Sequence, residues 1–181
     1  MLLPLISGTA LVRVLRRFRR NRRGSTAVEF ALVAPMFFAL LFAIIETAMV
    51  FFASQVLETA TQDTARLILT GQAQNGGFTQ AQFKSSLCSR LTDLFDCANG
   101  IYIDVKSYPT FSSVAITDPI DSNKNFTNNM TYSPGSQGDV VVVRVFYQWP
   151  IFVTSLGYNI ANLSNNKRLL SATAAFRNEP Y

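Results

Sequence analysis

The chain has 181 residues, of which 49% are hydrophobic and only 15% charged. Its 15 phenylalanines give it enough apolar surface to fold or to lie in lipid, which excludes an intrinsically disordered chain. The sequence contains no histidine, so Ser-His and Cys-His catalysis, imidazole metal ligands and histidine pH switches are excluded. The length suits one domain, or a membrane segment followed by one small domain.

The net charge of +5 is concentrated in one short region. Seven arginines lie between Arg13 and Arg23, and no acidic residue occurs before Glu29. The rest of the chain has fewer bases than acids. A nucleic-acid-binding domain places its basic residues on a folded face, whereas this run directly precedes an apolar segment. The pattern predicts a basic leader and no nucleic-acid partner.

The apolar segment runs from Phe30 to Ala53, and its only charged residue is Glu46. At about 1.5 Å per residue, a helix of this length spans the hydrocarbon core of a bilayer, which is about 30 Å thick. The preceding arginines predict a cytoplasmic N-terminus, with everything after about Gln55 outside the cytoplasm. A cleaved secretory signal is the alternative, although its apolar run is usually shorter, at about 7 to 15 residues.

The junction between the arginines and the apolar helix reads RRGSTAVEF, from Arg22 to Phe30. A glycine followed five positions later by a glutamate carries little information alone, but here it follows a basic leader and opens an apolar helix. In this the sequence resembles a prepilin, and the Glu29-Phe30 pair is similar to the Flp type of tight-adherence (Tad) pilus systems. The resemblance implies cleavage between Gly24 and Ser25 by a membrane prepilin peptidase, which removes the leader and keeps the helix.

Glu29 would lie close to the helix N-terminus that this cleavage creates. The helix dipole and a freed Ser25 amine would both favour its negative charge. In pilin assemblies such a carboxylate faces the N-terminal amine of a neighbouring subunit, so the resemblance implies that Glu29, with Phe30, helps the subunit to enter the assembly. The alternative is a helix-start acid at the lipid headgroups.

Two other residues of the apolar segment need an explanation. Pro35 lacks a backbone N–H, which removes the hydrogen bond to Ala31 and predicts a kink in the helix. The kink would be either a flexible joint for leaving the bilayer or incidental. Glu46 is an acid in an apolar surrounding, which is costly in hydrocarbon. It would either pair with a partner subunit or reach headgroup water.

Beyond the apolar segment the helix is predicted to continue, because apolar residues recur at a spacing near 3.6 up to Ile68. Gly71 is expected to stop this helix after Thr70. The expected organisation is a leader at 1–24, a transmembrane helix at 25–54, a helical extension at 55–71 and an extracytoplasmic domain at 72–181.

Thr79 is predicted to cap a second, shorter amphipathic helix, which carries Cys88 and is followed by Cys97. In one straight helix these cysteines would lie about 13 Å apart, so a disulfide requires a break near Asp96. An oxidising periplasm favours that disulfide, and the alternatives are a metal site or two buried thiols. The predicted apolar face of the helix consists of Phe83, Leu87, Leu91, Leu94 and Phe95.

Three later segments predict strands of a small antiparallel sheet: Ile101 to Lys106, Val140 to Trp149, and Leu169 to Phe176. Residues 117–138 are rich in Asn, Ser, Pro and Gly, and are expected to form a long exposed loop, either a binding surface or an unstructured excursion. The expected fold class is α+β and pilin-like, with a long N-terminal transmembrane and amphipathic helix, a second short helix and this sheet.

The C-terminal tail reads AAFRNEPY, from Ala174 to Tyr181. In size and layout the chain resembles the TadE-like minor pseudopilins, which combine a short basic leader, one such helix, a compact extracytoplasmic domain and a tail of this Asn-Glu-Pro kind. TadF-like pseudopilins share the junction motif and stay an alternative. The resemblance implies a single-pass protein of the bacterial inner membrane with a periplasmic domain, either incorporated into the pilus or only priming its assembly.

The function implied by this resemblance is assembly or initiation of an adhesive Flp pilus, without enzymatic activity. The implied partners are prepilin peptidase, other Tad pilins and pseudopilins, and the inner-membrane pilus platform, with no cofactor, metal or small-molecule substrate. A signal-anchored periplasmic enzyme is one rival, but no spacing among the aspartates, Asp104 included, brings a defined catalytic pair together. The other rival is an anchored binding protein, adhesin or sensor whose leader is not cleaved.

Overall fold

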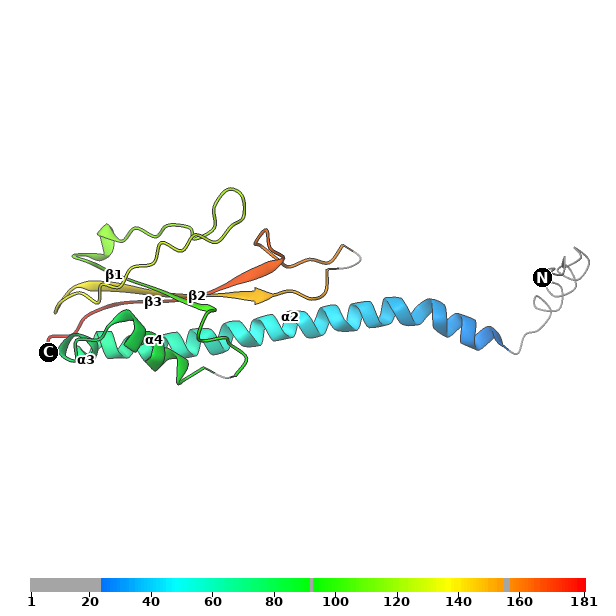
Figure 1. Ribbon diagram of the computed structural model, residues 1–181, viewed down its shortest axis with the longest axis horizontal. Coiled ribbons are helices and arrows are strands. Elements are labelled where there is room, and N and C mark those ends of the chain that lie inside the picture. Colours follow the sequence, from blue (N-terminus) through cyan, green and yellow to red (C-terminus); the bar gives the residue numbers. More distant parts are fainter. Residues whose placement is uncertain (1–23, 92, 155–156) are drawn as a thin grey trace, which may run out of the picture. The chain divides into compact units, whose positions relative to one another are not determined.

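The computed structural model describes residues 24–91, 93–154 and 157–181, so the predicted leader lies outside the described residues except for Gly24. The chain divides into two compact units, one ending at Phe42 and one running from Ala43 to Tyr181. In chain order the main elements are α2 (Ser25–Leu69), α3 (Gln72–Asn75), α4 (Gln80–Cys88), β1 (Ile101–Tyr108), β2 (Val140–Pro150) and β3 (Lys167–Arg177) (Figure 1). This is the α+β class that the sequence predicts.

The first unit consists, in its described part, of the beginning of α2. Its large apolar side chains are exposed, with Leu32 at 72%, Met36 at 71% and Phe30 at 67%. Helix α2 contains an 18-residue window with a mean hydropathy of 2.4, none of it buried. A helix that is apolar all round and has no protein packed on it is compatible with a single-pass membrane anchor.

The second unit is built on the remainder of α2, one face of which is buried. Thr61 and Thr64 lie on this face, and their hydroxyls donate to the carbonyl oxygens of Leu57 and Ala60, both at 2.7 Å, so the buried hydroxyls are satisfied within the helix. Small residues on this face allow the sheet to approach closely. The buried residues of the face are Val50, Ala53, Leu57, Ala60, Thr61, Thr64, Ala65 and Ile68.

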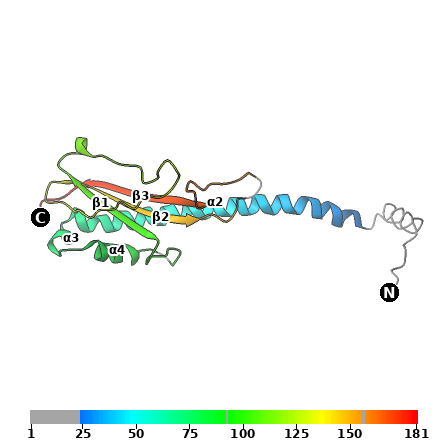
Figure 2. The same ribbon diagram turned by 45° about the horizontal axis from the view of Figure 1, so that its top comes forward.

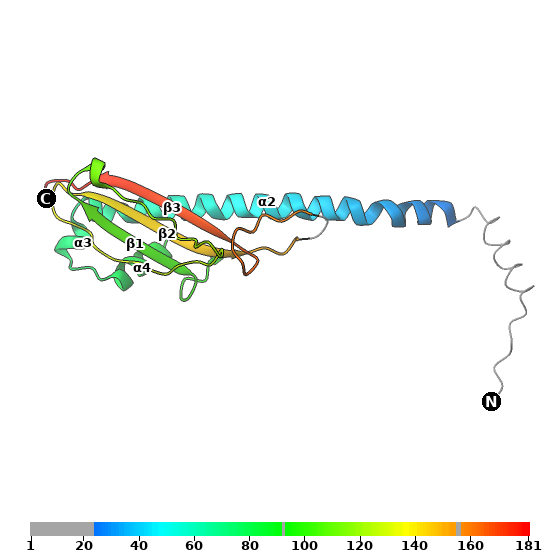
Figure 3. The same ribbon diagram turned by 90° about the horizontal axis from the view of Figure 1, so that it is seen from above.

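The sheet is three-stranded and antiparallel, with β2 between β1 and β3 (Figures 2 and 3). In its register Val143 lies between Val105 of β1 and Ala174 of β3. These side chains share the face that packs on α2, because alternate residues of a strand point to the same side. Strand β2 is buried over most of its length, which requires cover on the opposite face as well.

Residues 117–138 form a long irregular segment, as predicted, and none of them is fully buried, but part of this segment supplies that cover. Residues 120–130 lie over the sheet face opposite α2 (Figure 1), whereas residues 131–133 run along the free edge of β1: the Val105 N–H donates to the Thr131 carbonyl (2.8 Å) and the Ser133 N–H to the Val105 carbonyl (2.9 Å). The apolar side chains of residues 120–130 pack on that face because β2 is apolar on both faces. The resulting cluster consists of Phe146, Leu163 and Leu169, with Tyr102, Ile120, Phe126 and Met130 packed against it.

Helix α4 begins as predicted, because Thr79 forms a capping box with Gln82. It ends at Cys88, however, earlier than the break that the sequence places near Asp96. Side chains satisfy a carbonyl of its last turn, since Ser89 Oγ and Arg90 Nη1 both donate to the Ser86 oxygen, at 2.9 and 2.6 Å. The predicted apolar face is therefore split: Phe83, Leu87 and Phe95 are buried, whereas Leu94 is 40% exposed.

Candidate functional site

The predicted processing and assembly residues lie together at the start of α2. Gly24 forms a short turn just before the helix, and Ser25 is the first helical residue. The Ser25 hydroxyl donates to a carboxylate oxygen of Glu29 at 3.1 Å. Glu29 and Phe30 are both exposed. The glycine, the residue that would become the new N-terminus and the acid therefore lie within about one and a half turns at the exposed start of the helix.

Pro35 lies inside α2, which continues through it to Leu69. Its side chain is exposed, and so are those of its neighbours Met36 and Phe37. The structure thus places the predicted kink within the exposed apolar part of the helix. The flexible joint proposed from its missing N–H stays a prediction.

Glu46 has a partner that the sequence does not suggest. It is only 7% exposed, and the chain following β2 lies against it. One carboxylate oxygen accepts the backbone N–H of Phe152 at 2.5 Å, and the Val153 N–H donates to both oxygens, at 3.2 and 3.0 Å. Glu46 is therefore bonded within the chain, while a contact with a partner subunit or with headgroup water stays a prediction. Two amide donors compensate the burial of this acid.

A second contact fastens the same stretch of chain to the helix. The hydroxyls of Tyr158 and Thr47 are hydrogen-bonded to each other, and the Tyr158 hydroxyl also donates to the Ala43 carbonyl at 3.3 Å. Sequence reasoning missed this contact because Tyr158 lies more than a hundred positions after Thr47. The only sequence signal is an acid and a threonine side by side in an apolar segment.

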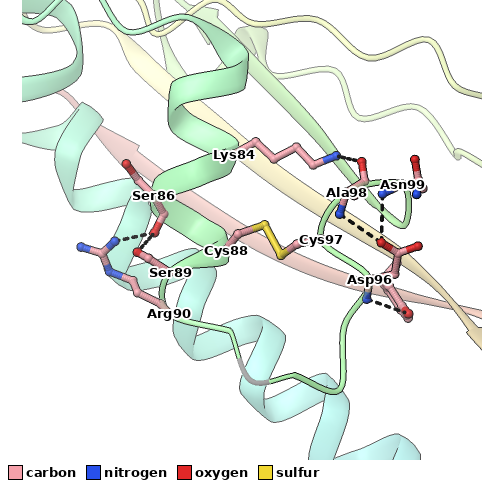
Figure 4. Close-up of a disulfide and its surroundings, with 10 residues drawn as sticks. Lys84, Ser86, Cys88, Ser89, Arg90, Asp96, Cys97, Ala98 and Asn99 are labelled. Atoms are coloured by element: carbon pink, nitrogen blue, oxygen red, sulfur yellow. Dashed lines mark hydrogen bonds between the residues drawn. A yellow bond between two sulfur atoms is a disulfide. The ribbon is translucent and has the colours of Figure 1, made fainter.

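Cys88 and Cys97 form a disulfide, with a Cα–Cα distance of 5.9 Å (Figure 4). The early end of α4 allows the chain to turn back so that Cys97 faces the helix. The returning chain is held by Lys84, whose ammonium donates to the Ala98 carbonyl at 3.0 Å, and by Asp96, which accepts the Ala98 N–H at 3.1 Å. The bond ties the end of α4 to the segment that leads into β1. Among the described residues, no group of three or more Cys, Asp or Glu side chains is placed to hold a metal ion.

A buried ion pair lies on the sheet face opposite α2. Arg144 donates to Asp104 at 2.7 Å and to the Thr117 carbonyl at 2.7 Å, while the backbone and hydroxyl of Thr131 donate to Asp104 at 3.0 and 3.1 Å. Burial raises the pKa of Asp104, but the hydrogen bonds from Arg144 and Thr131 outweigh it, so the pKa lies below its usual value. The pair therefore holds residues 117–131, which we call the covering segment, to β1 and β2 at Thr117 and Thr131.

Comparison with known proteins finds a match that covers Gly24 and most of α2. Residues 24–66 match the family model described as TadE-like protein. This segment is similar to TadE-like proteins. The match begins at Gly24 and includes Ser25, Glu29 and Phe30, so it confirms the family resemblance predicted from the junction motif. Searches of curated proteins and of solved structures gave no match.

The C-terminal tail lies outside the matched segment, and in the structure it is hydrogen-bonded to two other parts of the chain. The Glu179 N–H donates to the Leu69 carbonyl at the end of α2, at 2.9 Å. The Asn178 side chain donates to the carbonyls of Pro134 and Ser136, both at 3.0 Å. The Asn-Glu pair thus joins the end of α2 to the turn that precedes β2. The resemblance of this tail to those of TadE-like pseudopilins stays a prediction.

Proposed function

We propose that this Tad pilus-related protein is a minor pseudopilin that lacks enzymatic activity. Prepilin peptidase would cleave it between Gly24 and Ser25, and it would then take part in assembling or initiating an adhesive Flp pilus. The observation that carries the proposal is the TadE-like match that begins at Gly24, where the basic leader ends. The N-terminus would lie in the cytoplasm, because the arginines precede the apolar helix, and the second unit in the periplasm.

The two units would have different functions. The exposed apolar beginning of α2 suits both the bilayer and the helices of other pilins, because each offers apolar surface to pack on. The second unit, with its sheet packed on the later part of α2, would act as a cap or docking platform outside the membrane. Other Tad pilins, pseudopilins and the inner-membrane platform are the partners that fit this arrangement.

Gly24→Ala is expected to abolish leader removal without disturbing the fold, because a Cβ at this position meets no atom within 4 Å. The measurement is the intact mass and N-terminal sequence of the membrane-extracted protein, co-expressed with a Tad prepilin peptidase. The unchanged chain should begin at Ser25, and the variant should keep residues 1–24. A catalytically inactive peptidase is the control. Retention of the leader in the unchanged chain with the active peptidase would instead support an anchored binding protein or sensor.

Glu29→Gln is expected to leave leader removal intact and to reduce the number of surface pili by roughly tenfold or more. A hydrogen bond to a charged group contributes about 1.5–3 kcal/mol, and the amide removes the charge that would pair with a neighbouring N-terminal amine. The measurement is electron microscopy of cells whose own copy is deleted and complemented. Glu58→Gln is the matched control on the same helix, since Glu58 bonds only locally, to Gln62. Normal piliation in Glu29→Gln would contradict this role.

A further inference from the structure

The chain leaving β2, which we call the exit segment (Ile151 to Thr154), combines a fixed backbone with an exposed aromatic ring. Its backbone is bonded to Glu46 through the N–H groups of Phe152 and Val153. The side chain of Ile151 is buried, but that of Phe152 is 81% exposed, more than any other large apolar side chain among the described residues of the second unit. The large apolar ring of Phe152 is thus exposed, although its backbone is held in place by hydrogen bonds.

The same end of the second unit exposes further apolar side chains from α2. They belong to the helical turns on either side of Glu46, and they are exposed rather than packed against the sheet. Single exposed apolar residues are common, but a group drawn from two distant segments marks a surface that binds something apolar. The exposed residues are Ile44 at 58%, Ile45 at 48%, Met49 at 37%, Phe51 at 70% and Phe52 at 53%.

Basic side chains lie at this same end of the sheet. Lys167 and Arg168 begin β3 and are paired in register with Pro150 and Trp149, directly before the exit segment. No acidic residue occurs between Trp149 and Asn178. Phosphate groups of a lipid surface attract such positive charges, whereas the acyl boundary beneath them accommodates Phe and Tyr side chains. The combination of apolar and basic residues matches a lipid interface better than it matches an apolar protein groove.

The length of α2 before Glu46 matches the thickness of the hydrocarbon core. From Ser25 to Glu46 the helix rises by about 30 Å, at about 1.5 Å per residue, which equals the thickness of the hydrocarbon core. Glu46 would therefore mark the point at which α2 leaves the hydrocarbon, earlier than the boundary after residue 54 that the sequence predicts. Its amide partners supply the hydrogen bonds that water would provide there.

We propose that the exit segment lies on the outer surface of the membrane and inserts Phe152 into the interfacial region of the bilayer. The proposal rests on the membrane anchorage assumed in the proposed function. The Glu46 contacts hold the backbone of the exit segment, and Lys167 and Arg168 add positive charge to the strand paired with the residues just before it. The periplasmic unit is then a body seated on the bilayer rather than one tethered above it.

The test measures the depth of single tryptophans in the full chain, reconstituted into phosphatidylethanolamine and phosphatidylglycerol vesicles. The native tryptophan is removed by Trp149→Phe, and Phe152→Trp places the probe on the exit segment. Vesicles carry lipids brominated either near the headgroups or near the bilayer centre. We expect at least twofold quenching of Phe152→Trp by the shallow bromines and little by the deep ones.

Two matched Phe→Trp variants in the same background serve as controls. Phe111→Trp should not be quenched, because Phe111 is 61% exposed but follows the end of β1 that pairs with Val140, at the opposite end of the sheet. Phe37→Trp should be quenched by the deep bromines, because Phe37 lies in the apolar part of α2. Circular dichroism checks that the variants are folded.

The outcomes separate this proposal from the proposed function. If Phe37→Trp is quenched but Phe152→Trp behaves like Phe111→Trp, the chain is anchored and the interfacial position of the exit segment is wrong. If Phe37→Trp is not quenched either, the membrane anchorage itself fails, and this inference fails with it. If position 152 is protected from aqueous acrylamide without bromine quenching, a protein neighbour covers Phe152, which also overturns the proposal.

Discussion

Asp104→Ala is expected to lower the free energy of unfolding by about 3–5 kcal/mol, because it leaves a buried arginine without its partner. Arg144 is only 7% exposed, and the carboxylate is its charged partner, 2.7 Å away. The variant also removes the acceptor for both Thr131 donors. The covering segment should therefore detach from β1 and become sensitive to protease. Urea titration of the full chain in detergent, followed by Trp149 fluorescence, measures the loss.

The effect of Asp104→Ala should depend on pH in a defined direction. The folded-state pKa of Asp104 lies below that of the unfolded chain, so its contribution is fully present above the unfolded value, about 3.9. It is lost as the pH falls through the lower folded-state pKa. The stability difference between the unchanged chain and the variant should thus be constant near neutrality and shrink below about pH 4.

Lys106→Ala is the matched control for this pair. Lys106 also contacts the Asp104 carboxylate, at 3.4 Å, but its side chain is 32% exposed. Because exposed ion pairs contribute about 0–1 kcal/mol, the control should change stability little. Equal losses in the two variants would mean that the Asp104–Arg144 pair is not the contact that holds the segment.

Leu57→Ala is expected to destabilise the second unit by about 2–5 kcal/mol, the usual cost of a cavity left by a fully buried leucine. Leu57 is 0% exposed and lies in the cluster formed by α2 and the sheet. A cavity there loosens the packing of the sheet on the helix. The same urea titration measures the change.

The matched control for Leu57→Ala is Leu94→Ala, which removes the same atoms from a side chain that is 40% exposed. It should cost well under the buried substitution, because less apolar surface returns to water and the surrounding chain can close the gap. A similar loss in both would show that Leu57 does not contribute to the docking of α2 on the sheet.

The accuracy of sequence-based prediction varied with the range of the contacts involved. Thr79, Gly71 and Pro150 act on their immediate neighbours, and the elements they delimit begin or end within one residue of the predicted positions. Helix α4 was predicted too long, because its apolar spacing continues past Cys88 although the side chains of Ser89 and Arg90 bond to the Ser86 carbonyl in its last turn. The sequence pattern shows the apolar spacing, but it does not show that side chains bond to the carbonyl that a longer helix would use.

The sequence by itself determined the apolar helix, the junction motif with Gly24 and Glu29, and the three strands, because each depends on residue type and local spacing. Only the tertiary structure decided the partners of Asp104 and Glu46 and the place of residues 117–138. Each of these depends on contacts between segments far apart in the chain, such as Glu46 with Phe152. A buried acid must find hydrogen-bond donors, but only the folded backbone determines which amides reach it.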